Sequence, residues 1–254
     1  MSDKKKKSTT YSVIRWLVSV FYPKIELEGL ENLPSEPSII VGNHSQMHGP
    51  IASELYFPGK RRIWCAGEMM HADEVQPYAY RDFWSYKPKY IRWFYKLLSY
   101  AIVPLSVCIF NHANTIGVYR DIRIISTFKT TIRALQDGAN IIIFPEHDQP
   151  HNHILCDFQT KFIDLGKLYY KKTGKDLPFV PIYIAPKLKK MFIGKPIYYN
   201  HDLPAEEECV RISRYLMDEI TRIACDLPEH TVIPYLNISP RLYHTNKQKE
   251  DSAS

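Results

Sequence analysis

The sequence predicts an α/β domain with a mostly parallel sheet covered by helices. Strand-like and helix-like segments alternate through the middle of the chain, and the strand-like ones are short apolar runs. The chain has 254 residues, 45% hydrophobic and 24% charged, which is ordinary globular composition. Because no repeat or linker divides it, we expect one domain over residues 23–240. A basic flexible tail (1–10) and an amphipathic helix (11–22) would precede it, and a flexible tail (241–254) would follow.

Apolar runs and helical spacing define the expected elements. The expected strands are Ser38–Asn43, Arg62–Ala66, Thr115–Tyr119, Asn140–Phe144, Phe179–Ile184 and Lys195–Tyr199. The expected helices of the domain are Asp121–Asp137, Asp157–Thr173 and Pro204–Asp226, with Gly138 and Gly174 as stops for the first two. A further helix is expected to begin at Gly49-Pro50.

Charge and cysteine content narrow the classes of partner and compartment. The net charge of +6 favours a membrane surface with anionic lipids or a phosphate-bearing substrate. We expect no nucleic-acid partner, because no nucleic-acid-binding signature is present. The five cysteines form no CxxC pair, which indicates a reducing compartment. With no signal-peptide cleavage pattern and no apolar run of about 18 residues, we expect a cytoplasmic protein, peripheral on the cytoplasmic face of a membrane.

Two segments favour membrane contact. On helix 11–22, one wide apolar stripe follows the lysine run at 4–7. The stripe consists of Val13, Trp16, Leu17, Val20 and Phe21. The alternative is a helix packed on its own domain.

The second segment is an aromatic amphipathic insertion at 68–110. Its expected apolar helical face contains Ile91, Phe94, Tyr95, Leu98 and Ile102, and its polar face contains Lys89, Arg92, Lys96 and Ser99. A membrane contact or an acyl-chain groove would use this face. A small satellite core is the alternative.

His44 is the strongest candidate for chemistry. It follows the apolar run Ser38–Asn43 and precedes the expected helix at Gly49-Pro50, so it sits at the edge of the sheet where open α/β folds bind ligands. Imidazole accepts a proton near neutral pH, and this suits general-base catalysis.

Four motifs in order resemble the PlsC-like glycerolipid (1-acylglycerol-3-phosphate) acyltransferases. Asn43-His44 begins the first block, normally His-x4-Asp, after a family-like lead-in at Glu28–Pro34. The remaining blocks correspond to Gly117-Val118-Tyr119-Arg120, to Phe144-Pro145-Glu146 and to Phe179–Tyr183. The resemblance covers Leu27 to Ile223 and implies a glycerol-3-phosphate acyltransferase-like fold.

The resemblance also implies a reaction and a set of site residues. His44 would be the base for transfer of a fatty acyl group from acyl-CoA or acyl carrier protein to a glycerolipid-like hydroxyl, with no cofactor. Arg120 would grip the phosphate of the acceptor. Other substrate contacts are expected from Asn43, Tyr119, Pro145 and His147.

The chain departs from the family pattern at Gly49, where the motif has its aspartate, and after Glu146, where glycine and arginine are missing. Loss of the orienting carboxylate costs about 10⁴ in kcat in a serine-protease triad, or about 5.5 kcal/mol of barrier. We therefore expect Glu146 or Asp148 to orient His44, with His48 as a further candidate.

Two other functions stay open. The chain could be a catalytically silent lipid-binding relative that lost the aspartate. Alternatively, His147, His151 and His153 could serve a metal-dependent hydrolase, although no HExxH pattern is present and we assign no metal ligand.

Overall fold

The computed structural model describes residues 8–85 and 88–247. Most of the expected tail at 1–10 and the end of the expected tail at 241–254 therefore lie outside the described residues.

Contacts within the chain divide it into two compact units. Unit 1 comprises Met1–Tyr22 and Arg62–Thr131, and unit 2 comprises Pro23–Arg61 and Ile132–Ser254. The second boundary falls inside helix α6 (Ile124–Gln136), where no linker composition marks it. This explains why the sequence predicts a single domain over 23–240.

A largely parallel sheet forms the centre of unit 2 and confirms the predicted α/β class. Its strands are β1 (Glu26–Glu28), β2 (Ile39–Gly42), β5 (Asn140–Ile143), β8 (Pro178–Ala185) and β9 (Lys190–Ile193), with β10 (Ile197–Tyr198) beside β8. In the order β1-β9-β8-β2-β5, strand β2 pairs parallel with both β8 and β5, and β1 pairs parallel with β9. The hairpin β8–β9 and the short strand β10 add antiparallel pairs.

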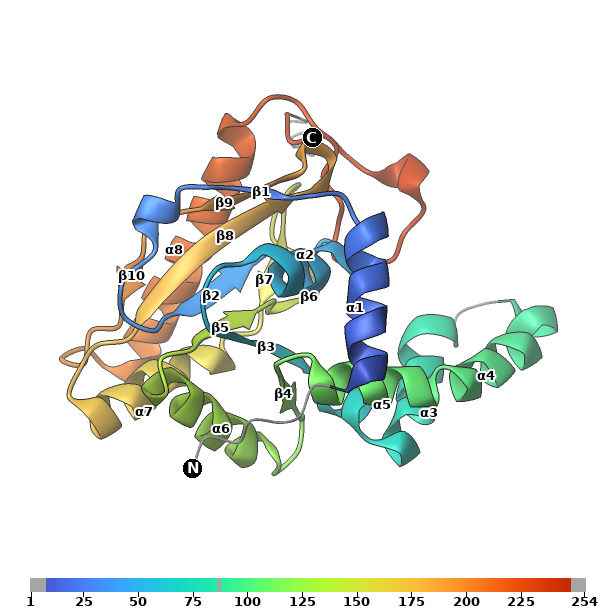
Figure 1. Ribbon diagram of the computed structural model, residues 1–254. Helices are drawn as coiled ribbons and strands as arrows, with labels where there is room; N and C mark the ends of the chain where they lie inside the picture. The colour runs from blue at the N-terminus through green and yellow to red at the C-terminus, as the bar shows by residue number, and fades with distance from the viewer. Residues whose placement is uncertain (1–7, 86–87, 248–254) are drawn as a thin grey trace. The chain divides into compact units, whose positions relative to one another are not determined.

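Helices bury both faces of this sheet. All residues of β2 and β8 are buried, as expected for parallel strands with both faces covered. Figure 1 shows α2 (His48–Tyr56) in front of the sheet and α8 (Ala205–Asp226) behind it. The buried stripe of α8 contains Ile212, Leu216, Ile220 and Ile223, as its periodicity predicts. Helix α7 (Asp164–Thr173) completes the unit.

Three parts of unit 2 differ from what the sequence predicts. The helix expected from Asp157 begins at Asp164, because Cys156–Phe158 forms strand β7 and pairs with β6 (Glu146–Pro150). Strand β9 was not expected from the sequence; it forms as the return strand of a hairpin from β8. Asn246, which lies in the segment expected as a flexible tail, is buried, and its Nδ2 donates to the carbonyl of Ala224 (2.8 Å).

Unit 1 combines a parallel strand pair with several helices. The strands are β3 (Arg61–Ala66) and β4 (Thr115–Val118), and the helices are α1 (Thr9–Phe21), α3 (Ala72–Ala79), α4 (Arg92–Ala101) and α5 (Val103–His112). Helix α1 contacts α5, where Tyr11 stacks on His112. Tyr11 is the one buried residue of α1, and the residues of the expected apolar stripe are exposed.

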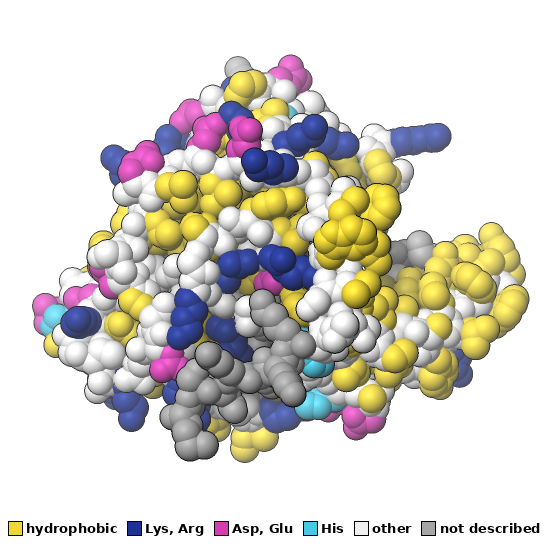
Figure 2. All heavy atoms as spheres, viewed as in Figure 1, with side chains coloured by type: hydrophobic (Ala, Val, Ile, Leu, Met, Phe, Trp, Pro, Cys, Tyr) yellow, Lys and Arg dark blue, Asp and Glu magenta, His cyan; other side chains and the backbone are white. Residues whose placement is uncertain are grey.

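Helix α4 also exposes apolar side chains. Trp93 is 70% and Leu97 is 62% exposed, and Figure 2 shows hydrophobic side chains gathered over α4 and α1. Ser99, expected on the polar face, is buried instead, and Gln76 Nε2 donates to its hydroxyl (3.0 Å). No single described helix is long and apolar enough to cross a membrane; Lys89–Ala101 and Val103–His112, bent by 43°, pass that test only as a pair.

Candidate functional site

The carboxyl ends of two parallel strands bring His44 and Glu146 together. Strands β2 and β5 pair in register, with Val41 opposite Ile143, so the residues that follow them meet at one edge of the sheet. The His44 backbone N–H donates to Glu146 Oε1 (2.6 Å), and the Cys156 backbone N–H donates to Glu146 Oε2 (2.9 Å). Glu146 is only 4% exposed, so its carboxylate is a buried link between the end of β2 and strand β7.

The ring of His44 is fixed by a main-chain oxygen. His44 Nδ1 makes a short hydrogen bond with the carbonyl oxygen of Gln46. Because a carbonyl can only accept, the neutral ring must carry its proton on Nδ1, and this leaves the lone pair on Nε2. Phe144 and Tyr235 meet the ring edge-on at centroid distances of 5.5 and 5.6 Å, and no described residue hydrogen-bonds to Nε2.

A left-handed turn places that carbonyl. Ser45 and Gln46 have φ angles of 44° and 54°, although neither is glycine. Such residues cost about 1–3 kcal/mol each and persist only where the surroundings enforce them. Asn43 does so on one side: its Nδ2 donates to Ser45 Oγ (2.7 Å) and to the Ile184 carbonyl (3.0 Å), and its Oδ1 accepts from the Ile184 N–H (2.7 Å).

Burial shifts the pKa of both titratable groups of the site. It lowers the pKa of His44, and the hydrogen bond to Gln46 opposes that shift only in part, so the ring is neutral at pH 7. Burial raises the pKa of Glu146 to about 7, against the hydrogen bonds from the backbone N–H groups of His44 and Cys156. The arrangement thus holds a neutral imidazole suited to accept a proton at Nε2.

The expected orienting residues do not contact the imidazole through a hydrogen bond. Glu146 uses both carboxylate oxygens on backbone N–H groups, and Asp148 has a side chain 82% exposed beside His147. His48 begins α2 and is half-buried, but Nδ1 of His44 is already bonded to Gln46. The prediction that one of these side chains orients His44 is therefore wrong, because the turn after β2 places the Gln46 carbonyl oxygen in hydrogen-bonding contact with His44 Nδ1.

Gly49 is required by close packing. A Cβ atom at this position would lie 2.6 Å from the His44 carbonyl oxygen, 2.9 Å from the Asn43 carbonyl oxygen and 2.8 Å from the Phe144 ring. Real Cβ atoms do not approach backbone oxygens this closely. In this turn the motif position has no room for any side chain, and an aspartate is excluded along with the rest.

Among the unit 2 residues expected to contact substrate, Asn43 and Pro145 have structural roles. Asn43 is buried and spends its amide on Ile184 and Ser45. Pro145 is buried, and its carbonyl accepts from the Gln159 N–H (2.9 Å). His147 is half-buried at the start of β6, and its Nδ1 accepts from the Gln149 N–H (3.3 Å). Asn43 and Pro145 thus hold the backbone that carries His44 and Glu146.

The second block lies in unit 1 at the end of β4. The Tyr119 hydroxyl and His71 Nε2 share a hydrogen bond (2.8 Å). The guanidinium carbon of Arg123 lies over the Tyr119 ring, 4.1 Å from its centroid. Arg123 also pairs with Asp121 (2.9 Å) and Glu74 (2.7 Å), so carboxylates already neutralise it.

Arg120, by contrast, is exposed. It has no ion pair with a carboxylate among the described residues. Of the two neighbouring arginines, it is the one available to an anion.

The three histidines of the proposed metal cluster face different partners. His147 lies beside Asp148, His151 beside Asp157 (3.4 Å), and His153 beside the Asn246 carbonyl (3.3 Å). Within residues 8–85 and 88–247, no three His, Cys, Asp or Glu side chains are placed to share a metal ion. The structure gives the metallo-hydrolase alternative no ligand set.

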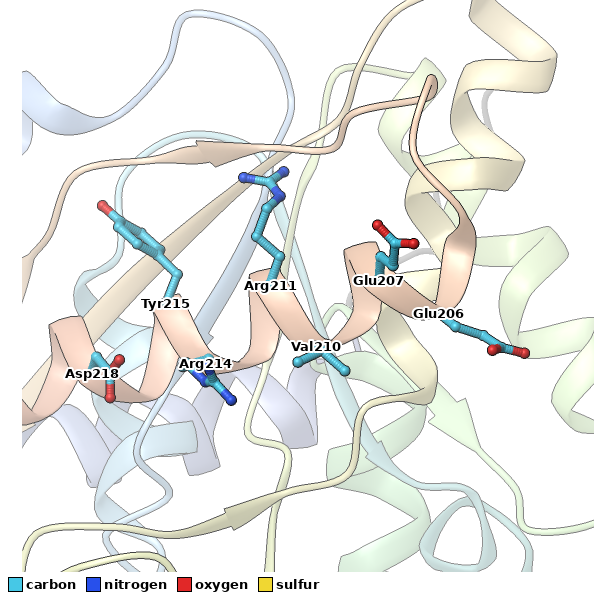
Figure 3. Close-up of a pocket in the computed structure, with 7 residues that line it drawn as sticks. All are labelled: Glu206, Glu207, Val210, Arg211, Arg214, Tyr215 and Asp218. Carbon is cyan, nitrogen blue, oxygen red and sulfur yellow. The ribbon is translucent and has the colours of Figure 1, made fainter.

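Two hollows lie on unit 2. One is a surface depression along α8, lined by charged and apolar side chains of that helix alone (Figure 3). Its Arg211 and Tyr215 are bonded to the Tyr198 and Lys195 carbonyls, and no residue of the His44 turn lines it. The other is a cavity of about 420 Å³ between the β6–β7 hairpin and residues 232–244. Its lining includes Tyr235, which contacts the His44 ring, and Tyr243.

Sequence reasoning did not find Gln46, Tyr235 or Tyr243. The absence of the motif aspartate at Gly49 indicated that another group orients His44, but no pattern marks a backbone carbonyl as that group. The Gln46 Nε2 amide donates to the Tyr243 hydroxyl oxygen across 197 residues of sequence, which no local signal reveals.

Comparison with known proteins gives a likeness to solved structures. No protein-family model and no curated protein matches the chain. Among solved structures, the chain is similar to the 1-acyl-sn-glycerophosphate (LPA) acyltransferase PlsC from Thermotoga maritima. The two share 16% identity over 88% of this chain and 84% of that chain, with a TM-score of 0.44.

Proposed function

We propose that the protein is an O-acyltransferase that moves a fatty acyl group from a thioester donor, acyl-CoA or acyl carrier protein, to a hydroxyl of a glycerolipid-like acceptor. The observation that carries the proposal is the neutral His44 ring, with Nδ1 held by a carbonyl and Nε2 free of hydrogen bonds from described residues. Its place at the carboxyl edge of a parallel sheet is where open α/β folds bind their substrates.

The reaction follows from that geometry. His44 Nε2 takes the proton of the acceptor hydroxyl as its oxygen attacks the thioester carbonyl. An ester bond forms, the carbon–sulfur bond breaks, and the departing thiolate takes the proton back from the imidazolium. The carbonyl of Gln46 maintains the productive tautomer but stabilises the imidazolium less than a carboxylate does. Since the 10⁴-fold loss in the triad includes a wrong tautomer, we expect a smaller loss here.

Arg120 is the proposed anion contact. Its exposed guanidinium has no carboxylate partner among the described residues, whereas Arg123 is saturated by Asp121 and Glu74. A planar guanidinium binds a phosphate through two parallel hydrogen bonds. A phosphate-bearing acceptor of the lysophosphatidate type fits this residue.

The cavity beside Tyr235 is the proposed place for a fatty chain. Apolar side chains form most of its lining: Pro150, Ile154, Leu155, Cys156, Val232, Pro234, Leu236, Ile238 and Leu242. A volume of about 420 Å³ lies in the range of small-molecule pockets, which is about 300–1,000 Å³. The contact of Tyr235 with the His44 ring joins this apolar space to the base.

An anionic lipid surface is the proposed setting. The exposed apolar side chains of α1 and α4 belong to one unit, and the exposed Lys89 and Lys96 flank those of α4. Trp, Leu and Phe side chains beside lysines bind the interface of a bilayer with anionic headgroups. Acceptors of the glycerolipid class reside in such a surface.

Release of free thiol from acyl-CoA in the presence of lysophosphatidate tests the activity. We expect His44→Ala to lower the rate by about 10²–10⁴, the usual contribution of a general base. His201→Ala is the matched control, because that histidine stacks on Tyr170 elsewhere in unit 2. If the wild-type protein releases no more thiol than His44→Ala with any donor and acceptor, the silent-relative alternative replaces the enzyme.

A further inference from the structure

The turn after β2 offers His44 a partner of a different chemical kind from the motif carboxylate. The Gln46 carbonyl is uncharged and only accepts hydrogen bonds. It therefore selects the Nδ1–H tautomer as a carboxylate would, without adding a negative charge next to the ring. Orientation and charge stabilisation, which one aspartate supplies together, are separated in this chain.

The Gln46 side chain ties that carbonyl to a distant part of the fold. Gln46 Nε2 is 2.8 Å from the Tyr243 hydroxyl oxygen and 3.4 Å from the Leu236 carbonyl oxygen. Asn43 holds the other side of the turn through its bond to Ser45 Oγ (2.7 Å). The left-handed pair Ser45-Gln46 is thus held from both sides, so the direction of the carbonyl is set by tertiary contacts.

Gly49 makes the carbonyl and a motif carboxylate mutually exclusive. The Gly49 N–H donates to the His44 carbonyl (3.0 Å), and the absent Cβ would lie 2.6 Å from the same oxygen. That oxygen and the Asn43 carbonyl oxygen belong to the backbone at the end of β2, so they cannot move aside as a flexible side chain could. A side chain at position 49 would have to displace the turn that presents Gln46.

We propose that the Gln46 main-chain carbonyl replaces the motif aspartate as the positioning group for His44, and that Tyr243 and Gly49 are positioning residues that maintain it. The catalytic meaning of this inference rests on the proposed function, but the geometry does not. Two expectations follow. The neutral ring carries its proton on Nδ1 in the free protein, and restoring the aspartate lowers the activity.

The tautomer is measured without substrate by ¹⁵N NMR of the full chain with labelled histidine, with the His44 signals assigned by their loss in His44→Gln. We expect Nδ1–H as the major neutral form of His44, and a mixture of both tautomers in Tyr243→Phe. Tyr198→Phe is the control, because its hydroxyl donates instead to Glu36 on the surface. A wild-type ring protonated mainly on Nε2 overturns the proposal, whatever the activity.

The kinetic arm compares Gly49→Asp with Gly49→Ala. Both introduce the clashing Cβ, so we expect kcat to fall about tenfold or more in both, with no rescue by the carboxylate. Tyr243→Phe should lower kcat about three- to tenfold at unchanged KM, the effect of one lost hydrogen bond. A higher kcat in Gly49→Asp than in the wild type would overturn the proposal. An inactive wild type with the Nδ1–H tautomer would instead refute the acyltransferase assignment and leave the geometry standing.

Discussion

The substitution Glu146→Gln measures how much the buried charge of Glu146, beside His44, lowers the free energy of unfolding. The pKa of Glu146 is raised from 4.5 to about 7, chiefly by burial. Between these two pH values the folded protein therefore binds more protons than the unfolded chain. The stability that depends on the protonated form is fully present below pH 4.5 and is lost as pH rises through 7. At about 1.36 kcal/mol for each unit, the loss is about 3 kcal/mol.

The assay is urea unfolding of the wild type and Glu146→Gln from pH 4.5 to 8, followed by far-UV circular dichroism. Tryptophan fluorescence is unsuitable, because all four tryptophans lie in unit 1. Glutamine cannot ionise, and the other titrating groups are common to both proteins. We expect the wild type to lose about 3 kcal/mol relative to the variant across this range.

Glu36→Gln is the matched control. The pKa of Glu36 is lowered, first by its own backbone hydrogen bond, so this carboxylate is ionised in both states above about pH 5.5. Its difference from the wild type should be flat from there to pH 8. If the Glu146→Gln difference is also flat, or if the wild type gains stability with rising pH, the carboxylate does not carry the burial cost inferred from its surroundings.

Three further outcomes follow from the contacts. Arg120→Ala should raise KM for lysophosphatidate about 10–100-fold and leave KM for an unphosphorylated alcohol unchanged, because one charge-assisted contact is lost; equal effects on both acceptors would argue against a phosphate contact. Trp93→Ser with Leu97→Ser should weaken sedimentation with anionic vesicles about 100-fold, whereas Ile125→Ser, exposed on α6, should not. Asn43→Ala should lower the free energy of unfolding by about 2–4 kcal/mol in urea titrations, since it leaves the Ile184 N–H and carbonyl unpaired; a change below 1 kcal/mol would contradict the clamp.

Much of the fold was predictable because burial patterns are local. The apolar runs that became β2, β5 and β8 are short and flanked by turn residues, so they indicated strands buried on both faces. Strand β7 was misread as the start of a helix, because Cys156–Phe158 has no strand pattern of its own and forms through pairing with β6. The second boundary between the two compact units lies inside α6, where no change of composition marks it.

The sequence predicted which residues of the candidate site are neighbours, but not which of their atoms interact. Parallel strands end at one edge, so a histidine after β2 and a glutamate after β5 were expected to be neighbours, and His44 and Glu146 are. The glutamate was expected at the imidazole and instead holds the backbone N–H of His44. Side-chain type and strand order do not determine which atom of a neighbour a carboxylate reaches.

The sequence alone determined the α/β class, the strand that ends at His44 and the glycine at position 49, because these are matters of residue type and spacing. The tertiary structure decided how the imidazole is oriented. That depends on two left-handed residues held by Asn43 and by Tyr243, and such backbone conformations are set by long-range hydrogen bonds and close packing that no local pattern encodes.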